Sequence, residues 1–145
     1  MWPNMIRCFR VKLTKNLSVP KQLFFWGALF WTGIIAFFSL VQLNNIPLGS
    51  ISNIDKYVHA FFHFVFTSLW FLFFKKQIKG TSISKPLVFS LMLSIFFGIA
   101  IEILQELYTA TRHADVFDVL ANLTGATIAV IVILLLNRNK ISDII

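Results

Sequence analysis

The sequence predicts an all-α protein, a polytopic membrane bundle of four transmembrane helices with both termini on the cytoplasmic side. Hydrophobic residues make up 57% of the 145 residues and charged residues only 13%, whereas a soluble domain usually carries about 25% charged residues. The mean hydropathy of +0.78 indicates that lipid is the main solvent, which excludes a soluble enzyme and intrinsic disorder. In addition, four stretches contain the roughly 20 mostly apolar residues that a helix needs to cross a bilayer.

The first two spans are expected over residues 23–43 and 55–74. No Asp, Glu, Lys or Arg occurs from Gln22 to Ile54, and the turn-forming residues 44–49 interrupt the apolar pattern. Basic residues precede the first span, as they do in a signal peptide. Its apolar run exceeds the roughly 7–15 residues of a signal core, however, and no small-residue cleavage pattern follows. We therefore expect a retained signal anchor.

The third and fourth spans are expected over residues 86–107 and 116–136. Pro86 stands at the first turn of the third span, where its missing N–H costs no helical hydrogen bond. A short basic loop at 75–85 precedes this span. These boundaries divide the chain into a basic cytoplasmic tail, a four-helix transmembrane domain and a second cytoplasmic tail, at residues 1–21, 22–137 and 138–145.

The distribution of basic residues predicts the orientation. Eleven of the 13 Lys and Arg residues lie in the first tail, in the loop at 75–85 or in the second tail, and short flanks rich in these residues stay cytoplasmic. We therefore expect a multi-pass protein of the bacterial cytoplasmic membrane with both termini inside. This topology and attraction to anionic membrane lipids explain the net charge of +7. A nucleic-acid partner is not expected, because the sequence contains no basic domain.

The acidic residues show the opposite bias. Five of the six Asp and Glu residues lie near the predicted outer ends of the spans, namely Asp55, Glu102, Glu106, Asp115 and Asp118. Ionisable groups within a span are costly and usually face the interior of the bundle or a watery cavity. With a rise of about 1.5 Å per residue, His59, Glu102 and Asn122 reach similar depths. The sequence therefore predicts one polar pocket that opens to the outer face.

The chemistry of these side chains suggests roles for them. His59 is the candidate general acid or base, with Glu102 or Asp118 as its carboxylate partner. These three are the candidate catalytic residues, and Asp55, one helical turn before His59, could orient the imidazole. A second group is expected to bind a ligand, and comprises Asp55, Gln105, Arg112, Asp115 and Asn122.

Two of these assignments have alternatives. The guanidinium of Arg112 can clamp a carboxylate or a phosphate, but it could equally balance the charge of Asp115 and Glu106. The small residues Ala121, Gly125 and Ala129 on the fourth span allow a neighbouring helix to approach closely. The polar groups above them could then simply form hydrogen bonds between helices, as in a non-catalytic structural module.

A metal site is the less favoured interpretation. His59 and His63 are spaced i, i+4 with carboxylates nearby, which is a pattern that can bind a metal. His63 stands within a run of phenylalanines, however, and such a histidine is more often packed and singly hydrogen-bonded. We therefore expect no metal and no other cofactor.

Four short motifs follow one another between residues 55 and 129. They read Asp55-Lys56-x-x-His59, Gly98-x-x-x-Glu102-x-x-Gln105, Arg112-x-x-Asp115-x-x-Asp118 and Ala121-Asn122-x-x-Gly125. In this order and spacing they resemble the VanZ-like family of bacterial membrane proteins, in its short stand-alone form. The resemblance implies signature positions at Asp55, His59, Glu102, Gln105, Arg112, Asp118 and Asn122. His63 departs from the family pattern, in which an aromatic residue is more common at this position.

The resemblance also implies a role at the cell envelope, because the family takes its name from a protein associated with resistance to the glycopeptide teicoplanin. Together with the polar pocket, it predicts a protein that binds or processes a lipid-linked or cell-envelope ligand, with membrane lipids or a glycopeptide as partners. Both an enzyme and a non-catalytic binding module fit this prediction. Transport is disfavoured, since no ionisable residue lies in the inner half of the spans. The oligomeric state stays open.

Overall fold

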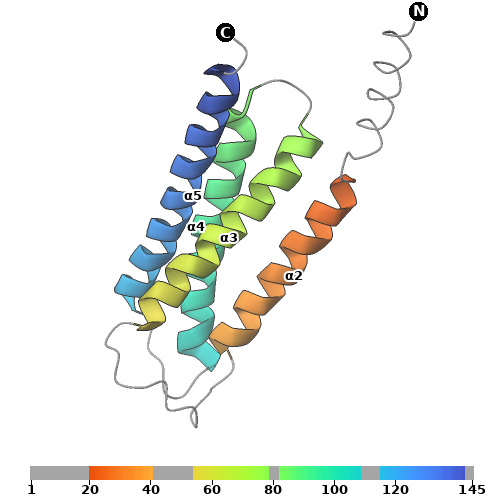
Figure 1. The fold of residues 1–145 in the computed structure, drawn as a ribbon. Helices are drawn as coiled ribbons and strands as arrows, with labels where there is room; N and C mark the ends of the chain where they lie inside the picture. Colours follow the sequence, from red (N-terminus) through yellow and green to blue (C-terminus); the bar gives the residue numbers. More distant parts are fainter. Residues whose placement is uncertain (1–19, 41–53, 79–81, 109–114, 143–145) are drawn as a thin grey trace, which may run out of the picture.

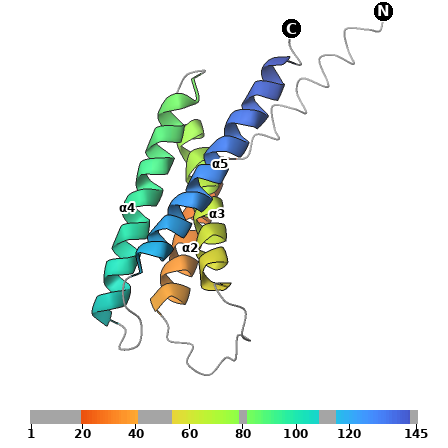
Figure 2. The same cartoon turned by 90° about the vertical axis from the view of Figure 1, so that its left-hand side faces the viewer.

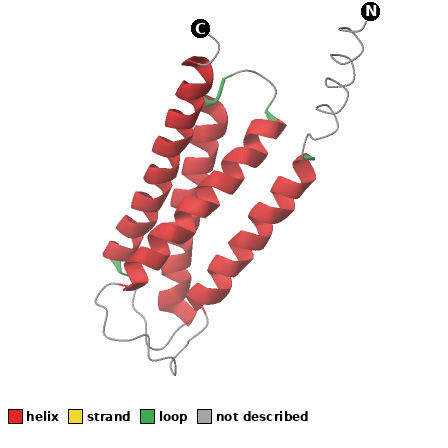
Figure 3. Ribbon diagram, viewed as in Figure 1, coloured by secondary structure: helices red, strands yellow, loops and turns green. Residues whose placement is uncertain are grey.

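The computed structural model describes residues 20–40, 54–78, 82–108 and 115–142. These residues form four helices and no strand: α2 (Lys21–Leu40), α3 (Ile54–Gln77), α4 (Ser84–Tyr108) and α5 (Val116–Ser142) (Figures 1 and 3). Each helix is long and apolar enough to cross a membrane, which confirms the predicted fold class. The orientation in the membrane stays a prediction.

Helix α3 is the centre of the bundle. It packs against each of the other three helices, α4 also packs against α2 and α5, and within the described residues α2 and α5 do not touch. Figure 2 shows α5 crossing α3 on one side of the bundle. Because α3 contacts every other helix, a side chain on its inner faces can meet side chains from several directions.

The crossing of α3 and α5 depends on small residues. A Cβ atom at Gly125 would lie within 2.9 Å of the Cα atom of Ala60, so the two backbones are in direct contact there. Ala126 and Ala129 of α5 are completely buried beside this crossing, whereas Ala121 is only partly buried. The small-residue stripe predicted on the fourth span is therefore the surface that packs against α3.

The two ends of the bundle differ in charge. Lys21 at the start of α2 donates a hydrogen bond from Nζ to Oε1 of Gln77 at the end of α3, over 3.3 Å. We call this the basic end; it carries the described basic residues Lys21, Lys75, Lys76, Lys85 and Arg138. The opposite end, where α3 and α5 begin and α4 finishes (Figure 1), is the acidic end and carries Asp55, Glu102, Glu106, Asp115 and Asp118.

The outside of the bundle is apolar. Large hydrophobic side chains are exposed along all four helices, among them Trp26, Phe61, Phe96 and Leu135. Exposed apolar area of this extent is costly in water but favourable in contact with lipid chains. The arrangement fits a membrane bundle that keeps its polar side chains inside and at its ends.

Candidate functional site

Three ionisable side chains from three helices meet at the acidic end. One ligand atom from each of His59 in α3, Glu102 in α4 and Asp118 in α5 lies within 4.8 Å of the other two. The side chains are 9%, 4% and 14% exposed, respectively. We call this group the His59–Glu102–Asp118 cluster. The three candidate catalytic residues thus lie together, and their ligand atoms are close enough to hold a metal ion.

Atomic distances within the cluster describe a loose arrangement. His59 Nδ1 lies 3.9 Å from Glu102 Oε1, and His59 Nε2 lies 3.8 Å from Asp118 Oδ2. Both distances exceed the usual range of a hydrogen bond. The imidazole therefore stands between two carboxylates without a direct hydrogen bond to either of these oxygens.

Asn122 of α5 positions the imidazole. Its Oδ1 lies 3.2 Å from His59 Nδ1, and the contact is buried. Because an amide oxygen can only accept a hydrogen bond, this contact requires a proton on Nδ1, and in the neutral form of the ring the lone pair is then on Nε2. We expected Asp55 to orient the ring. The side chain of Asp55 is instead 49% exposed, and its Oδ2 lies 3.8 Å from Lys56 Nζ.

Lys56 is the residue at this site whose role sequence reasoning missed. Its Nζ lies 3.2 Å from Asp115 Oδ2 and 3.4 Å from Asp118 Oδ1, so one ammonium group joins the start of α3 to the start of α5. The same atom lies 5.9 Å from the centre of the Phe117 ring. The sequence did contain a signal for this role. Lys56 directly follows Asp55 and lies at the end of the spans where most of the acidic residues are found.

Asp115 caps the N-terminus of α5. Its Oδ1 accepts a hydrogen bond from the backbone N–H of Phe117 over 2.8 Å, and its backbone oxygen accepts one from Asp118 over 3.0 Å. The Phe117 amide, and after it Lys56, hold the pKa of the Asp115 carboxyl below its usual value. Asp115 also donates its own N–H towards Glu102 Oε2, at 3.5 Å. The capping residue thus connects α5 with both Lys56 and the cluster.

Gln105 and His63 are buried but directed elsewhere. Gln105 Nε2 donates a hydrogen bond to the backbone oxygen of Ser39, 2.9 Å away, and so ties α4 to α2. His63 Nδ1 lies 2.8 Å from Ser94 Oγ in α4. The two histidines therefore have different partners, and the His59–His63 pair considered from the spacing is not the arrangement found. Arg112 lies outside the described residues.

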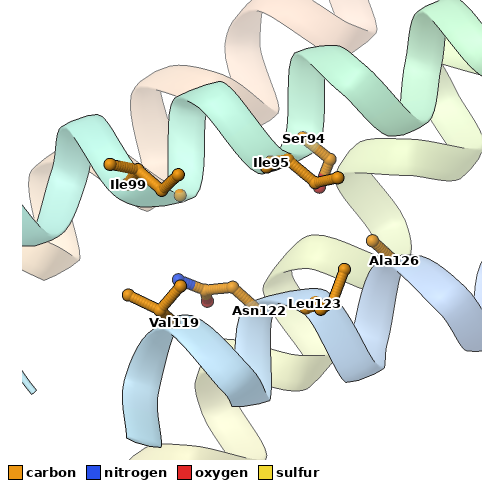
Figure 4. Close-up of a pocket in the computed structure, with 8 residues that line it drawn as sticks. Ser94, Ile95, Ile99, Val119, Asn122, Leu123 and Ala126 are labelled. Carbon is orange, nitrogen blue, oxygen red and sulfur yellow. The ribbon is translucent and has the colours of Figure 1, made fainter. Parts of the chain in front are cut away.

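A small cavity of about 90 Å³ lies between α4 and α5, and Asn122, the hydrogen-bond partner of His59, lines it (Figure 4). Its walls are mostly apolar side chains, with Asn122 and Ser94 as polar members. The Nδ2 atom of Asn122 is buried and has no hydrogen-bond partner among the described residues. Gly98 leaves room for this amide, because a Cβ at Gly98 would lie 3.2 Å from Asn122 Nδ2 and 3.0 Å from His63 Cε1.

Comparison with known proteins adds the family. The model of the VanZ/LLP1 family matches residues 19–137, a range that includes all four helices up to the last residues of α5. No curated protein and no solved structure gave a significant match.

Proposed function

The chain belongs to the VanZ/LLP1 family, and from this premise we propose that the His59–Glu102–Asp118 cluster binds and processes the polar head of a lipid-linked or cell-envelope molecule. The supporting observation is the convergence of one ionisable side chain from each of three helices in a buried cluster. Such groups are expensive at membrane depth and usually mark a function.

The details of the cluster favour a binding site over inter-helix hydrogen bonds alone. A network that only held the helices together would bring its donors and acceptors into hydrogen-bonding distance. Here His59 Nε2 lies 3.8 Å from Asp118 Oδ2, and the buried Asn122 Nδ2 has no described partner. These polar atoms are positioned for a ligand group that would complete their hydrogen bonds.

Each residue of the site has a chemical role in this proposal. His59 Nε2, with its lone pair towards the ligand, acts as general base, and Asp118 beside it stabilises the charged ring. Lys56 attracts an anionic head such as a phosphate, and Arg112 is expected to do the same. Since the basic residues gather at the other end, the positive-inside rule predicts that the acidic end, and hence the His59–Glu102–Asp118 cluster, lies at the outer face of the cytoplasmic membrane.

Native mass spectrometry of the mildly extracted protein tests this proposal. Wild-type protein and three variants, His59→Ala, Glu102→Gln and Glu106→Gln, would be compared for molecules that co-purify. Glu106→Gln is the matched control, because Glu106 lies one turn further along α4 and is exposed. We expect a lipid-linked molecule on wild type and Glu106→Gln, and at least a tenfold lower occupancy on the other two.

The mass of the retained molecule then separates binding from processing. Incubation of the loaded wild-type protein should convert the molecule, and His59→Ala should carry any residual molecule unchanged. Equal occupancy in all four proteins would remove His59 and Glu102 from the site and contradict the proposal.

A further inference from the structure

We propose that the His59–Glu102–Asp118 cluster binds one divalent metal ion, Mn²⁺ or Zn²⁺. The inference deepens the proposed function: the role of the ion rests on that function, but the binding of the ion does not. With the ion bound, His59 Nε2 is a metal ligand and not a general base, and the ion polarises the bound head group instead. The cluster offers one imidazole nitrogen and two carboxylate oxygens, all within 4.8 Å of one another. A mixed set of nitrogen and oxygen ligands without a thiolate suits Mn²⁺ or Zn²⁺ better than metals that prefer only oxygen or only sulfur.

Each carboxylate has one oxygen near the His59 ring and its other oxygen in contact with a different residue. Asp118 Oδ1 lies 3.4 Å from Lys56 Nζ, and its Oδ2 is the atom directed towards His59. Glu102 Oε2 accepts from the backbone N–H of Asp115, and its Oε1 is the atom directed towards His59. The contact with Lys56 orients the Asp118 carboxylate, and the contact with the Asp115 N–H orients that of Glu102, so that each directs its other oxygen towards His59.

The spacing of the cluster fits a shared ion better than direct hydrogen bonds. The nearest nitrogen–oxygen distances are 3.8 Å from His59 Nε2 to Asp118 Oδ2 and 3.9 Å from His59 Nδ1 to Glu102 Oε1. One ligand atom from each of the three residues lies within 4.8 Å of the other two. Two ligand atoms that are each about 2.1 Å from one ion lie roughly 3.0–3.5 Å apart at octahedral and tetrahedral angles. Side-chain rotations that shorten separations of up to 4.8 Å to roughly 3.0–3.5 Å would bring the three ligands onto one ion.

His59 is prepared as a ligand. The residue is 7% exposed, and the only hydrogen bond of its ring within the described residues runs from Nδ1 to Asn122. Its Nε2 lies 3.8 Å from Asp118 Oδ2 and has no hydrogen-bond partner among the described residues. A metal-bound histidine usually donates its other ring N–H to an oxygen, which fixes the tautomer and the ring orientation. Asn122 supplies that oxygen.

The charge at this end also favours a cation. Among the described residues of the acidic end, Lys56 is the single lysine or arginine beside five carboxylates. A divalent ion bound by Glu102 and Asp118 would add positive charge to this acidic end. Three protein ligands leave coordination positions for an oxygen of an anionic head group, which the ion would hold and polarise.

Metal titration of the full chain in detergent, with no lipid added, tests this inference. The purified protein would be stripped with a chelator and titrated with Mn²⁺ and with Zn²⁺. Bound metal would be measured by elemental analysis after equilibrium dialysis, and free Mn²⁺ by electron paramagnetic resonance. We expect one ion per chain on wild type and on Glu106→Gln. Glu102→Gln and Asp118→Asn should each weaken binding at least tenfold.

A thermal measurement separates binding from folding. Saturating metal should raise the unfolding temperature of wild type and Glu106→Gln, because an ion that binds only the folded state stabilises it. The metal should not change the unfolding temperature of Asp118→Asn or of Glu102→Gln. If one of these variants does not fold, the other is sufficient for the test. Wild type that takes up no ion, or variants that bind it as tightly as wild type, would overturn the inference. Neither result affects the native mass spectrometry of head-group binding.

Discussion

The chemistry proposed for His59 depends on what contacts each of its two ring nitrogens. Asn122 holds Nδ1, and Nε2 is left for a ligand, for a proton or for a metal ion. Asn122 in turn needs the space that Gly98 leaves, since a Cβ at Gly98 would also lie 3.3 Å from Asn122 Cβ. Gly98 has no reactive side chain, but the space that it leaves for Asn122 helps to orient the imidazole of His59.

Gly98→Ala should therefore weaken ligand or metal retention. The added methyl would press on Asn122 and His63, which lengthens the His59–Asn122 hydrogen bond and costs about 1–3 kcal/mol of stability through overpacking. Gly33→Ala is the control, because a Cβ at Gly33 meets nothing within 4 Å. Thermal unfolding and metal titration of the two variants check this expectation. A Gly98→Ala protein that matches Gly33→Ala in both assays would contradict it.

The packing of helix against helix sets the depth at which the cluster forms. Helices α3 and α5 touch at Ala60 and Gly125. Ala60 directly follows His59 in α3, and Gly125 lies about one turn after Asn122 in α5. The contact of the two backbones brings the imidazole and the amide within 3.2 Å of each other. The capping interaction of Asp115 and its contact with Lys56 hold the first turn of α5 against α3 at the acidic end.

Gly125→Ala should be more damaging than Gly98→Ala. The new methyl would meet backbone atoms of Ala60, which cannot rotate aside as a side chain can, so α3 and α5 must separate. We expect a loss of about 3 kcal/mol or more, at or above the upper end of overpacking costs, together with loss of ligand retention. Thermal unfolding in detergent measures the first effect. An unfolding temperature equal to that of Gly33→Ala would show that the helices do not pack as described.

Across the whole molecule, some features could be predicted from the sequence and others could not. Hydropathy predicted four helices, because a span must be long and apolar whatever its neighbours are. The convergence of His59 with Glu102 and Asp118 also followed, since helical periodicity and depth are local properties. The partners of Gln105 and Lys56 did not follow: Ser39 and Asp115 are far from them in sequence, and only the packing of the helices brings them near.

The orientation of the molecule can be tested on the native Cys8. The positive-inside rule places Cys8 in the cytoplasm and the segment between α2 and α3 outside. A membrane-impermeant maleimide should therefore fail to label wild type in intact cells and should label it after permeabilisation. A Cys8→Ser, Ser50→Cys protein should be labelled in intact cells. The reverse pattern would place the pocket at the cytoplasmic face and contradict the proposed orientation.

The unfolding temperature of ligand-free Glu102→Gln, stripped with a chelator and compared with wild type treated in the same way, decides between a ligand site and a purely structural cluster. Glutamine keeps the shape of the side chain and can still accept the N–H of Asp115, but it removes a buried ionisable carboxyl group. If the cluster is a ligand site that costs stability when empty, the variant should unfold at the same or a higher temperature. A clear fall in its unfolding temperature would mean that Glu102 serves to hold the helices together.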